Sequence, residues 1–167
     1  MKEMDLDRLL EISGERAEAL CDELYRISYL VKQNYELMSA LTDPKLAGEA
    51  KKKVIGDLMP GASKIFSEVI SLMIDQELIK ELDQVSVDFT LLVAKKMNIR
   101  FDEVIFSEKP GEDILNKFKK IAGDKIRYRI QIDPTLIGGF IWKTMDGKVM
   151  NASIKGRLSQ IREEIAA

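Results

Sequence analysis

Residues 125–133 read KIRYRIQID, and apolar and polar side chains alternate through the whole stretch. The apolar set is Ile126, Tyr128, Ile130 and Ile132, and the polar set is Arg127, Arg129 and Gln131. A strict alternation of period two is typical of a β-strand with one buried face and one face exposed to water. The stretch therefore predicts a sheet in the last third of the chain.

The residues that follow predict a hairpin and a closing helix. Asp133-Pro134 turns the chain, and residues 140–145 have the composition of a second strand. Asp146-Gly147 is a strong hairpin signal, and it leads into a third strand at residues 148–150. Ser153 can cap a last helix, because serine accepts a hydrogen bond from a free backbone N–H at a helix start. Its apolar stripe comprises Ile154, Leu158, Ile161 and Ile165.

Residues upstream of the alternating stretch add a strand and a helix. Residues 104–106, Val-Ile-Phe, have the composition of a short strand. Apolar residues at helical spacing follow over 114–121, and Gly123 is a natural helix end. We therefore predict a small C-terminal α+β domain over residues 101–167, with a three- to four-stranded sheet.

The first hundred residues predict helices only. Their apolar stripes fall in six segments, residues 5–12, 17–31, 35–41, 43–59, 65–73 and 78–99. Asp43-Pro44 is expected to open the fourth segment, and Pro60-Gly61 to end it. Helices with short connections form bundles. The predicted fold class is therefore α+β, with an N-terminal six-helix bundle over residues 1–100 followed by the small α+β domain.

The composition excludes several kinds of catalytic and metal-binding site. The 167 residues include no histidine and one cysteine, Cys21, so His-based triads, His metal sites and internal disulfides are excluded. No phosphate-binding glycine motif occurs. Cys21 lies beside an apolar helical stripe, where a buried filler is expected rather than a reactive thiol. We expect neither a cofactor nor a metal.

Carboxylates are the remaining candidates for catalysis. Most of them stand beside lysines in helical patterns, as in residues 49–53, which is typical of solvated helix faces. Asp75 and Glu77 fall at a helix junction, where a capping role is favoured. An enzyme built on two carboxylates stays open as a hypothesis, and it requires a pocket in which both converge.

Charge is unevenly distributed along the chain. Residues 1–124 contain 18 Lys and Arg against 24 Asp and Glu, whereas residues 125–167 contain 8 against 4. This asymmetry suggests two surfaces with different partners. A nucleic-acid-binding module that uses the Arg127/Arg129 face is an alternative function. Tyr128 falls on the opposite face and cannot stack beside these arginines, so we expect no nucleic acid.

Residues 133–165 read DPTLIGGFIWKTMDGKVMNASIKGRLSQIREEI, and this string resembles the closing segment of the delta subunit of F-type ATP synthases, the family of the oligomycin-sensitivity-conferring protein. The matching residues are Asp133, Leu136, Gly138, Gly139, Gly147, Val149, Ser153, Arg157 and Leu158. Two glycines that open a strand indicate positive φ, a bulge or a close backbone approach, although the residues alone favour a tight turn after Asp133-Pro134. The sequence departs from the family at Asn151, where an Asp is usual, at residues 75–78, and in the first helix.

The resemblance implies a stator subunit without an active site. In this family the helical domain binds the N-terminal helices of the alpha subunits between its first and fifth helices, and the C-terminal domain holds the b subunits of the peripheral stalk. The implied location is peripheral, on the cytoplasmic side of the inner (cell) membrane, without membrane insertion. The apolar residues of the fifth helix are the candidate partner groove: Ile65, Val69, Leu72 and Met73.

Overall fold

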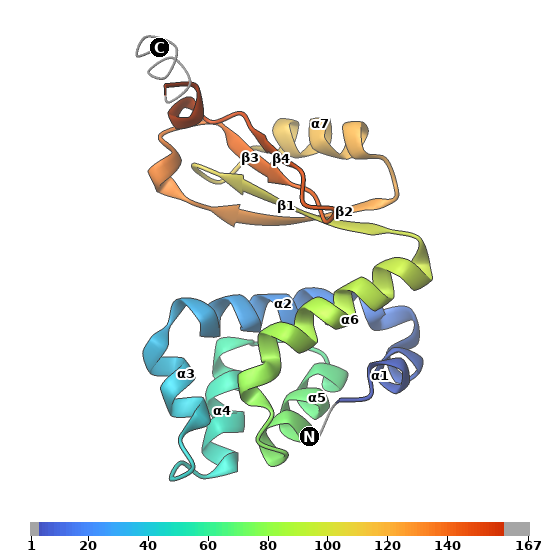
Figure 1. The fold of residues 1–167 in the computed structure, drawn as a ribbon, viewed down its shortest axis with the longest axis vertical. Coiled ribbons are helices and arrows are strands. Elements are labelled where there is room, and N and C mark those ends of the chain that lie inside the picture. The colour runs from blue at the N-terminus through green and yellow to red at the C-terminus, as the bar shows by residue number, and fades with distance from the viewer. Residues whose placement is uncertain (1–3, 159–167) are drawn as a thin grey trace. The chain divides into compact units, whose positions relative to one another are not determined.

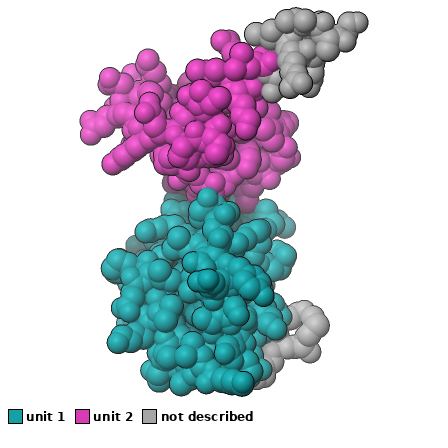
Figure 2. Space-filling view, turned by 90° about the vertical axis from the view of Figure 1, so that its left-hand side faces the viewer, with its two compact units in different colours: residues 1–96 teal, residues 97–167 magenta. Residues whose placement is uncertain are grey.

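The computed structural model describes residues 4–158 (Figure 1). The chain divides into two compact units, residues 1–96 (unit 1) and residues 97–167 (unit 2), which Figure 2 shows in different colours. The division falls in the last turn of helix α6 (Leu82–Met97). Each unit has its own secondary structure class, helices in the first and a sheet with helices in the second.

Unit 1 is the six-helix bundle that the sequence predicts, as far as its described residues go. The helices before α6 are α1 (Leu6–Ser13), α2 (Ala17–Gln33), α3 (Tyr35–Thr42), α4 (Gly48–Leu58) and α5 (Lys64–Asp75). Short 3₁₀ turns precede α2 and α6, at Gly14–Arg16 (η1) and Ile79–Glu81 (η2). The prediction of one continuous helix from residue 78 is therefore wrong at its first turn.

Side-chain caps explain where three of these helices begin. Asp5, Asn34 and Ser63 accept hydrogen bonds from backbone N–H groups in the first turns of α1, α3 and α5, at 3.0, 3.0 and 3.1 Å. Glu23 of α2 accepts further bonds from the backbone N–H and hydroxyl of Ser63, at 2.6 and 2.7 Å. This carboxylate lies at the positive end of the α5 dipole and joins α2 to α5.

The predicted start of the fourth helix at Asp43-Pro44 is wrong. α4 begins at Gly48, and Asp43 Oδ1 accepts a hydrogen bond from Lys45 N at 2.8 Å. The Asp43 side chain thus stabilises a tight turn at Lys45, two residues further along the chain. This local hydrogen bond competes with the use of the same side chain as a helix cap. Residues 43–47 form a connection instead of the first turn of a helix.

The core of unit 1 is built from the predicted stripes. Leu20, Leu24, Ile27 and Phe89 are among its fully buried side chains, and Cys21 is buried with them as expected. At the edge of this core, Asp83 of α6 accepts hydrogen bonds from two α2 side chains, Ser28 at 2.9 Å and Lys32 at 3.0 Å. The bond from Lys32 is the main reason why the pKa of Asp83 is lowered.

Unit 2 contains a four-stranded sheet in the order β2-β1-β3-β4. Its elements are β1 (Arg100–Phe106), α7 (Glu112–Ala122), β2 (Ile126–Ile132), the 3₁₀ turn η3 (Pro134–Leu136), β3 (Phe140–Lys143) and β4 (Val149–Asn151). β2 runs parallel to β1, whereas β3 is antiparallel to β1 and forms a hairpin with β4. The predicted α+β fold and its three- to four-stranded sheet are confirmed.

The predicted faces of β2 are only half right. The alternation is kept, and Tyr128 packs against the α7 side of the sheet. Ile130 and Ile132 on the same face are nevertheless 44% and 45% exposed, while the Arg129 guanidinium lies over the Phe101 ring, 4.8 Å from its centroid. β2 is an edge strand, so its apolar face is covered less completely than the alternation implies.

Helix α7 lies against one face of the sheet (Figure 1), and a single side chain, Phe118, anchors it there. Phe118 is 8% exposed, and its ring contacts four aromatic side chains, Phe106, Tyr128, Phe140 and Trp142. Leu115 is half-buried, and apart from these two every α7 side chain that the structure describes is exposed. The packing of this helix on the sheet therefore depends on one aromatic cluster.

We expect Phe118→Ala to destabilise unit 2 by about 3–5 kcal/mol, because it removes the centre of the aromatic cluster and leaves a cavity. Trp142, the one tryptophan of the chain, belongs to that cluster, so its fluorescence during urea unfolding follows unit 2. Lys119→Ala on the same helix is the control, since Lys119 is exposed. Equal stability of the two variants would contradict the anchoring role of Phe118.

Candidate functional site

The Gly138-Gly139 pair is a point of close backbone approach. Gly139 has φ of +81°, and a Cβ on this residue would overlap the carbonyl oxygen of Ala152 and lie 2.9 Å from Ser153 Cα. Two backbone hydrogen bonds connect the same two segments, residues 138–140 and 152–154. Ile154 N donates to Gly138 O at 3.0 Å, and Ala152 N donates to Phe140 O at 2.9 Å. Two of the alternatives that the glycine pair indicates, positive φ and close backbone approach, are therefore present at Gly139.

The start of the last helix is fixed by Asn151 and Ser153. Asn151 Oδ1 accepts hydrogen bonds from Ser153 N at 3.1 Å and from Ser153 Oγ at 2.7 Å. Ser153 Oγ in turn accepts a bond from Gly156 N at 3.0 Å, and residues 154–158 are helical. Ser153 is buried and caps this helix, as its position in the sequence predicts.

The remaining motif residues divide into three that shape turns or the core and three whose side chains are exposed. Asp133 caps η3 by accepting bonds from the N–H and hydroxyl of Thr135, and these bonds lower the pKa of Asp133. Leu136 is buried, and Gly147 has φ of +85° in the β3–β4 turn. The exposed members are Val149, Arg157 and Leu158. The first group holds the domain together, and the second is accessible to a partner.

Gly139→Ala should cost unit 2 at least twice the stability that Gly147→Ala costs. Both glycines have positive φ, which costs an L-residue about 1–2 kcal/mol. A Cβ at Gly147 meets nothing within 4 Å, whereas at Gly139 it meets backbone that cannot move aside. Urea unfolding followed by Trp142 fluorescence measures both variants. Equal losses would show that the close approach at Gly139 contributes nothing.

The α5 residues of the predicted partner groove point in two directions. Val69 and Met73 are buried in unit 1, with exposed fractions of 6% and 0%. Leu72 is 46% exposed and Ile65 is half-buried. A spacing of seven residues places Ile65 and Leu72 on the same side of the helix. Only these two of the four offer surface to another molecule.

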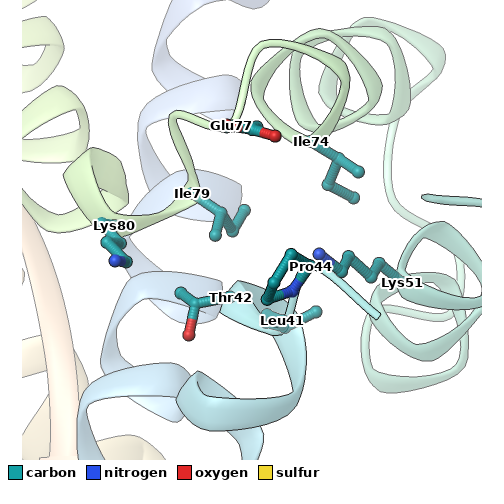
Figure 3. A pocket seen from close by; sticks show the side chains of 8 residues that line it. All are labelled: Leu41, Thr42, Pro44, Lys51, Ile74, Glu77, Ile79 and Lys80. Carbon is teal, nitrogen blue, oxygen red and sulfur yellow. The ribbon is translucent and has the colours of Figure 1, made fainter. Parts of the chain in front are cut away.

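A hollow of about 290 Å³ lies in unit 1, between the C-terminal end of α3, α4 and the α5–η2 connection (Figure 3). Leu41, Ile74 and Ile79 form its apolar floor, and Lys51 and Lys80 extend toward it from opposite sides. Its one carboxylate belongs to Glu77. An acid–base pair requires a second carboxylate, so this hollow does not support the carboxylate-enzyme hypothesis.

The basic face of β2 is engaged within the fold. Arg129 lies over the Phe101 ring, and Arg127 Nη1 donates a hydrogen bond to Asp124 O at 2.6 Å. Both arginines are half-buried, and Tyr128 lies on the other face as predicted. A surface for single-stranded RNA presents aromatic rings and unengaged basic groups together. This face therefore does not favour the nucleic-acid alternative.

The model of one protein family, the ATP synthase delta (OSCP) subunit, matches residues 9–165 of this chain. The chain belongs to this family. The match begins within α1 and continues through both units. Within the family's closing motif, Asn151 stands where an Asp is usual. Its amide oxygen accepts the two bonds from Ser153 that a carboxylate would accept, so the local structure tolerates the departure.

Two bacterial delta subunits are similar to this chain over most of its length. The delta subunit of Desulfotalea psychrophila is 25% identical over 150 residues, which cover 86% of this chain and 82% of the relative. The delta subunit of Bacillus thuringiensis is 26% identical over 164 residues, which cover 94% and 91%. A chain of the mitochondrial ATP synthase hexamer of Toxoplasma gondii aligns with a TM-score of 0.49 at 14% identity, over 97% of this chain and 95% of that chain.

Two kinds of feature are absent from residues 4–158. No helix in this range is long and apolar enough to cross a membrane. The described residues also contain no group of three or more acidic or cysteine side chains that could hold a metal ion.

One important residue, Asp102, is not singled out by the sequence. Its buried carboxylate accepts hydrogen bonds from Arg100 Nε at 2.8 Å, Trp142 Nε1 at 2.8 Å and Met145 N at 3.2 Å. The available signal is its position, since Asp102 shares one face of β1 with Arg100 and with the buried apolar residues Val104 and Phe106. A carboxylate there requires buried donors.

Proposed function

We propose that this chain is a non-catalytic stator subunit of a proton- or sodium-translocating F-type ATP synthase. Residues 1–100 bind the N-termini of the alpha subunits in the catalytic head, and residues 101–167 bind the b subunits of the peripheral stalk. The observation that carries this proposal is the family match, because it spans both units. The protein acts on the cytoplasmic side of the inner (cell) membrane as a peripheral component.

The work of such a stator protein is mechanical. It prevents the catalytic head from turning with the rotor, so it needs two lasting contacts and no reacting groups. A stable protein–protein contact buries about 1,200–2,000 Å² in total and depends on a few apolar anchors. Both units carry exposed apolar side chains that suit this role, Leu72 in unit 1 and Ile114 and Ile121 in unit 2.

On unit 1, the outward side of α5 is the proposed contact for the catalytic head. An amphipathic helix binds by laying its apolar stripe against apolar residues spaced by three, four or seven positions. Ile65 and Leu72 are seven positions apart, and Leu72 is the more exposed of the two. Val69 and Met73 support this surface from inside the core.

The charges of the two units favour different partners. Residues 1–96 contain 13 basic and 18 acidic side chains, and residues 97–167 contain 13 basic and 10 acidic ones. Opposite net charges orient each unit toward a different surface and raise the rate of encounter more than the affinity.

We expect Leu72→Asp to weaken binding of a peptide from the N-terminus of the cognate alpha chain at least tenfold, because it places a charge in an apolar contact. Val87→Asp on α6 is the matched control, since Val87 is 48% exposed and Leu72 is 46% exposed. Isothermal titration calorimetry on the full chain gives both dissociation constants. Circular dichroism confirms that both variants keep their helices.

Equal affinity of the wild-type chain and Leu72→Asp for the alpha peptide would show that α5 is not part of the contact with the catalytic head. Absence of binding to both the alpha peptide and the C-terminal segment of the b protein would contradict the proposed function itself.

A further inference from the structure

The hollow of unit 1 between α3, α4 and the α5–η2 connection has the size and composition of a small-molecule site (Figure 3). Ligand pockets combine apolar walls with a few polar groups, and the smallest of them measure about 300 Å³. This hollow measures about 290 Å³, and a cavity of about 150 Å³ already accommodates a molecule as large as benzene. It therefore has room for one apolar ring or branched chain together with a polar head group.

The apolar floor of this hollow is held in place by the bundle. Leu41, Ile74 and Ile79 are buried, and they come from the end of α3, the end of α5 and η2. Their packing within the core of unit 1 fixes the floor before any ligand arrives. An apolar group that covers the floor releases water from apolar surface, which is the main source of affinity in sites of this kind.

Lys51 lines the hollow and is half-buried, and it forms no ion pair with another described residue. The acidic side chains that α4 and α5 provide here, Glu49 and Asp75, pair instead with the neighbouring Lys52, at 3.3 and 3.0 Å. Lys80, on the opposite side of the hollow, is likewise without an ion pair in the described part of the chain (Figure 3). An ammonium group beside apolar surface has lost part of its hydration, so an anion held on that surface gains a charge-assisted hydrogen bond.

Glu77 occupies a backbone position that favours glycine. α5 closes with two hydrogen bonds, from Leu78 N to Met73 O at 2.8 Å and from Glu77 N to Ile74 O at 3.1 Å. This pattern takes a left-handed residue just after the helix, usually glycine, and Glu77 adopts that conformation with φ of +61°. Non-glycine residues in this conformation are concentrated at functional sites. Here the disfavoured residue brings the one carboxylate that lines the hollow.

We propose that this hollow binds a small apolar carboxylate, a molecule with one ring or short branched chain and a single negative charge. Its apolar part lies on the floor, and its carboxylate pairs with Lys51 and Lys80. Glu77 repels a second negative charge and thereby restricts the site to monoanions, since selectivity can be achieved by repulsion of the wrong ligand. None of the lining residues belongs to the proposed contact on α5, so the inference goes beyond the proposed function.

The test is titration of the ¹⁵N-labelled full chain with phenylpropionate, followed by the backbone amide signals in NMR spectra. Signals of the residues around the hollow should shift and saturate with one dissociation constant. Phenylpropionamide has the same ring and no charge, so it should bind at least tenfold more weakly. Absence of saturable shifts around the hollow would overturn the site. Equal affinity for the acid and the amide would overturn the pairing with the two lysines.

A pair of lysine variants tests whether the charge acts at one place. Lys51→Gln should weaken the binding of phenylpropionate at least fivefold and leave the binding of the amide unchanged. Lys53→Gln is the matched control, because Lys53 belongs to the same helix, is exposed and does not line the hollow. An equal loss in both variants would indicate general charge attraction, and no loss in either would exclude Lys51 from the site. Both results contradict the proposal.

Glu77→Gly tests the selection of ligand charge. Glycine suits the left-handed position, so the variant should unfold at a temperature at least as high as the wild-type chain. Benzylsuccinate adds a second carboxylate to the phenylpropionate skeleton. Its affinity relative to that of phenylpropionate should rise at least fivefold in Glu77→Gly. An unchanged ratio would show that Glu77 does not select the charge of the ligand.

A competition experiment distinguishes a free small molecule from a side chain of a partner. The peptide from the N-terminus of the cognate alpha chain should leave the dissociation constant of phenylpropionate unchanged within twofold. Displacement of phenylpropionate by this peptide would assign the hollow to the contact with the catalytic head and overturn a small-molecule site, while leaving the proposed function intact.

Discussion

The carboxylate of Asp102 holds unit 2 together. It is 1% exposed, and it accepts hydrogen bonds from a side chain of its own strand, from the indole of β3 and from the backbone of the β3–β4 turn. A buried charge of this kind is tolerated only when it is fully paired, and removal of one partner is strongly destabilising. The hydrogen bonds from Arg100 to this carboxylate raise the pKa of Arg100 further above its already high ordinary value.

The β3–β4 hairpin is consequently fixed at both ends. At its turn, Asp102 holds Met145, and at its open end the bare backbone of Gly139 lies against residues 152 and 153. The last helix begins at this second junction, under the cap formed by Asn151 and Ser153. The hairpin also forms one wall of an apolar hollow of about 500 Å³ beside α7. A wall held in two places suits a contact that carries a sustained load.

The opposite wall, α7, is held more loosely. One buried phenylalanine anchors it, and Ile114 and Ile121 remain exposed beside the sheet. Unit 1 has a comparable division, since buried α5 residues support an outward face that contains Leu72. In both units, buried polar and aromatic contacts fix the scaffold, while incomplete apolar packing leaves a surface for another protein.

Sequence reasoning recovers the features that depend on local spacing. The six helices, the hairpin turn at Asp146-Gly147 and the Ser153 cap all follow from short patterns, whereas the glycine pair indicates the close approach at Gly139 only as one of several alternatives. Asp102 does not, because its partners Trp142 and Met145 lie 40 and 43 residues further along the chain. The outward face of α5 also cannot be recognised from the sequence, since apolar residues occur on several sides of that helix. Only the fold shows that Leu72 is exposed while Met73 is buried. Asp43 shows how a turn can use a side chain that otherwise caps a helix.

The most direct test of the whole account is simultaneous binding. Native mass spectrometry of the full chain with two peptides, the N-terminus of the cognate alpha chain and the C-terminus of the cognate b protein, should give a complex with one copy of each. Each dissociation constant should change less than twofold when the other peptide is present, because the two contacts lie on separate units. Competition between the peptides, or binding of only one of them, would contradict a protein that joins the catalytic head to the stalk.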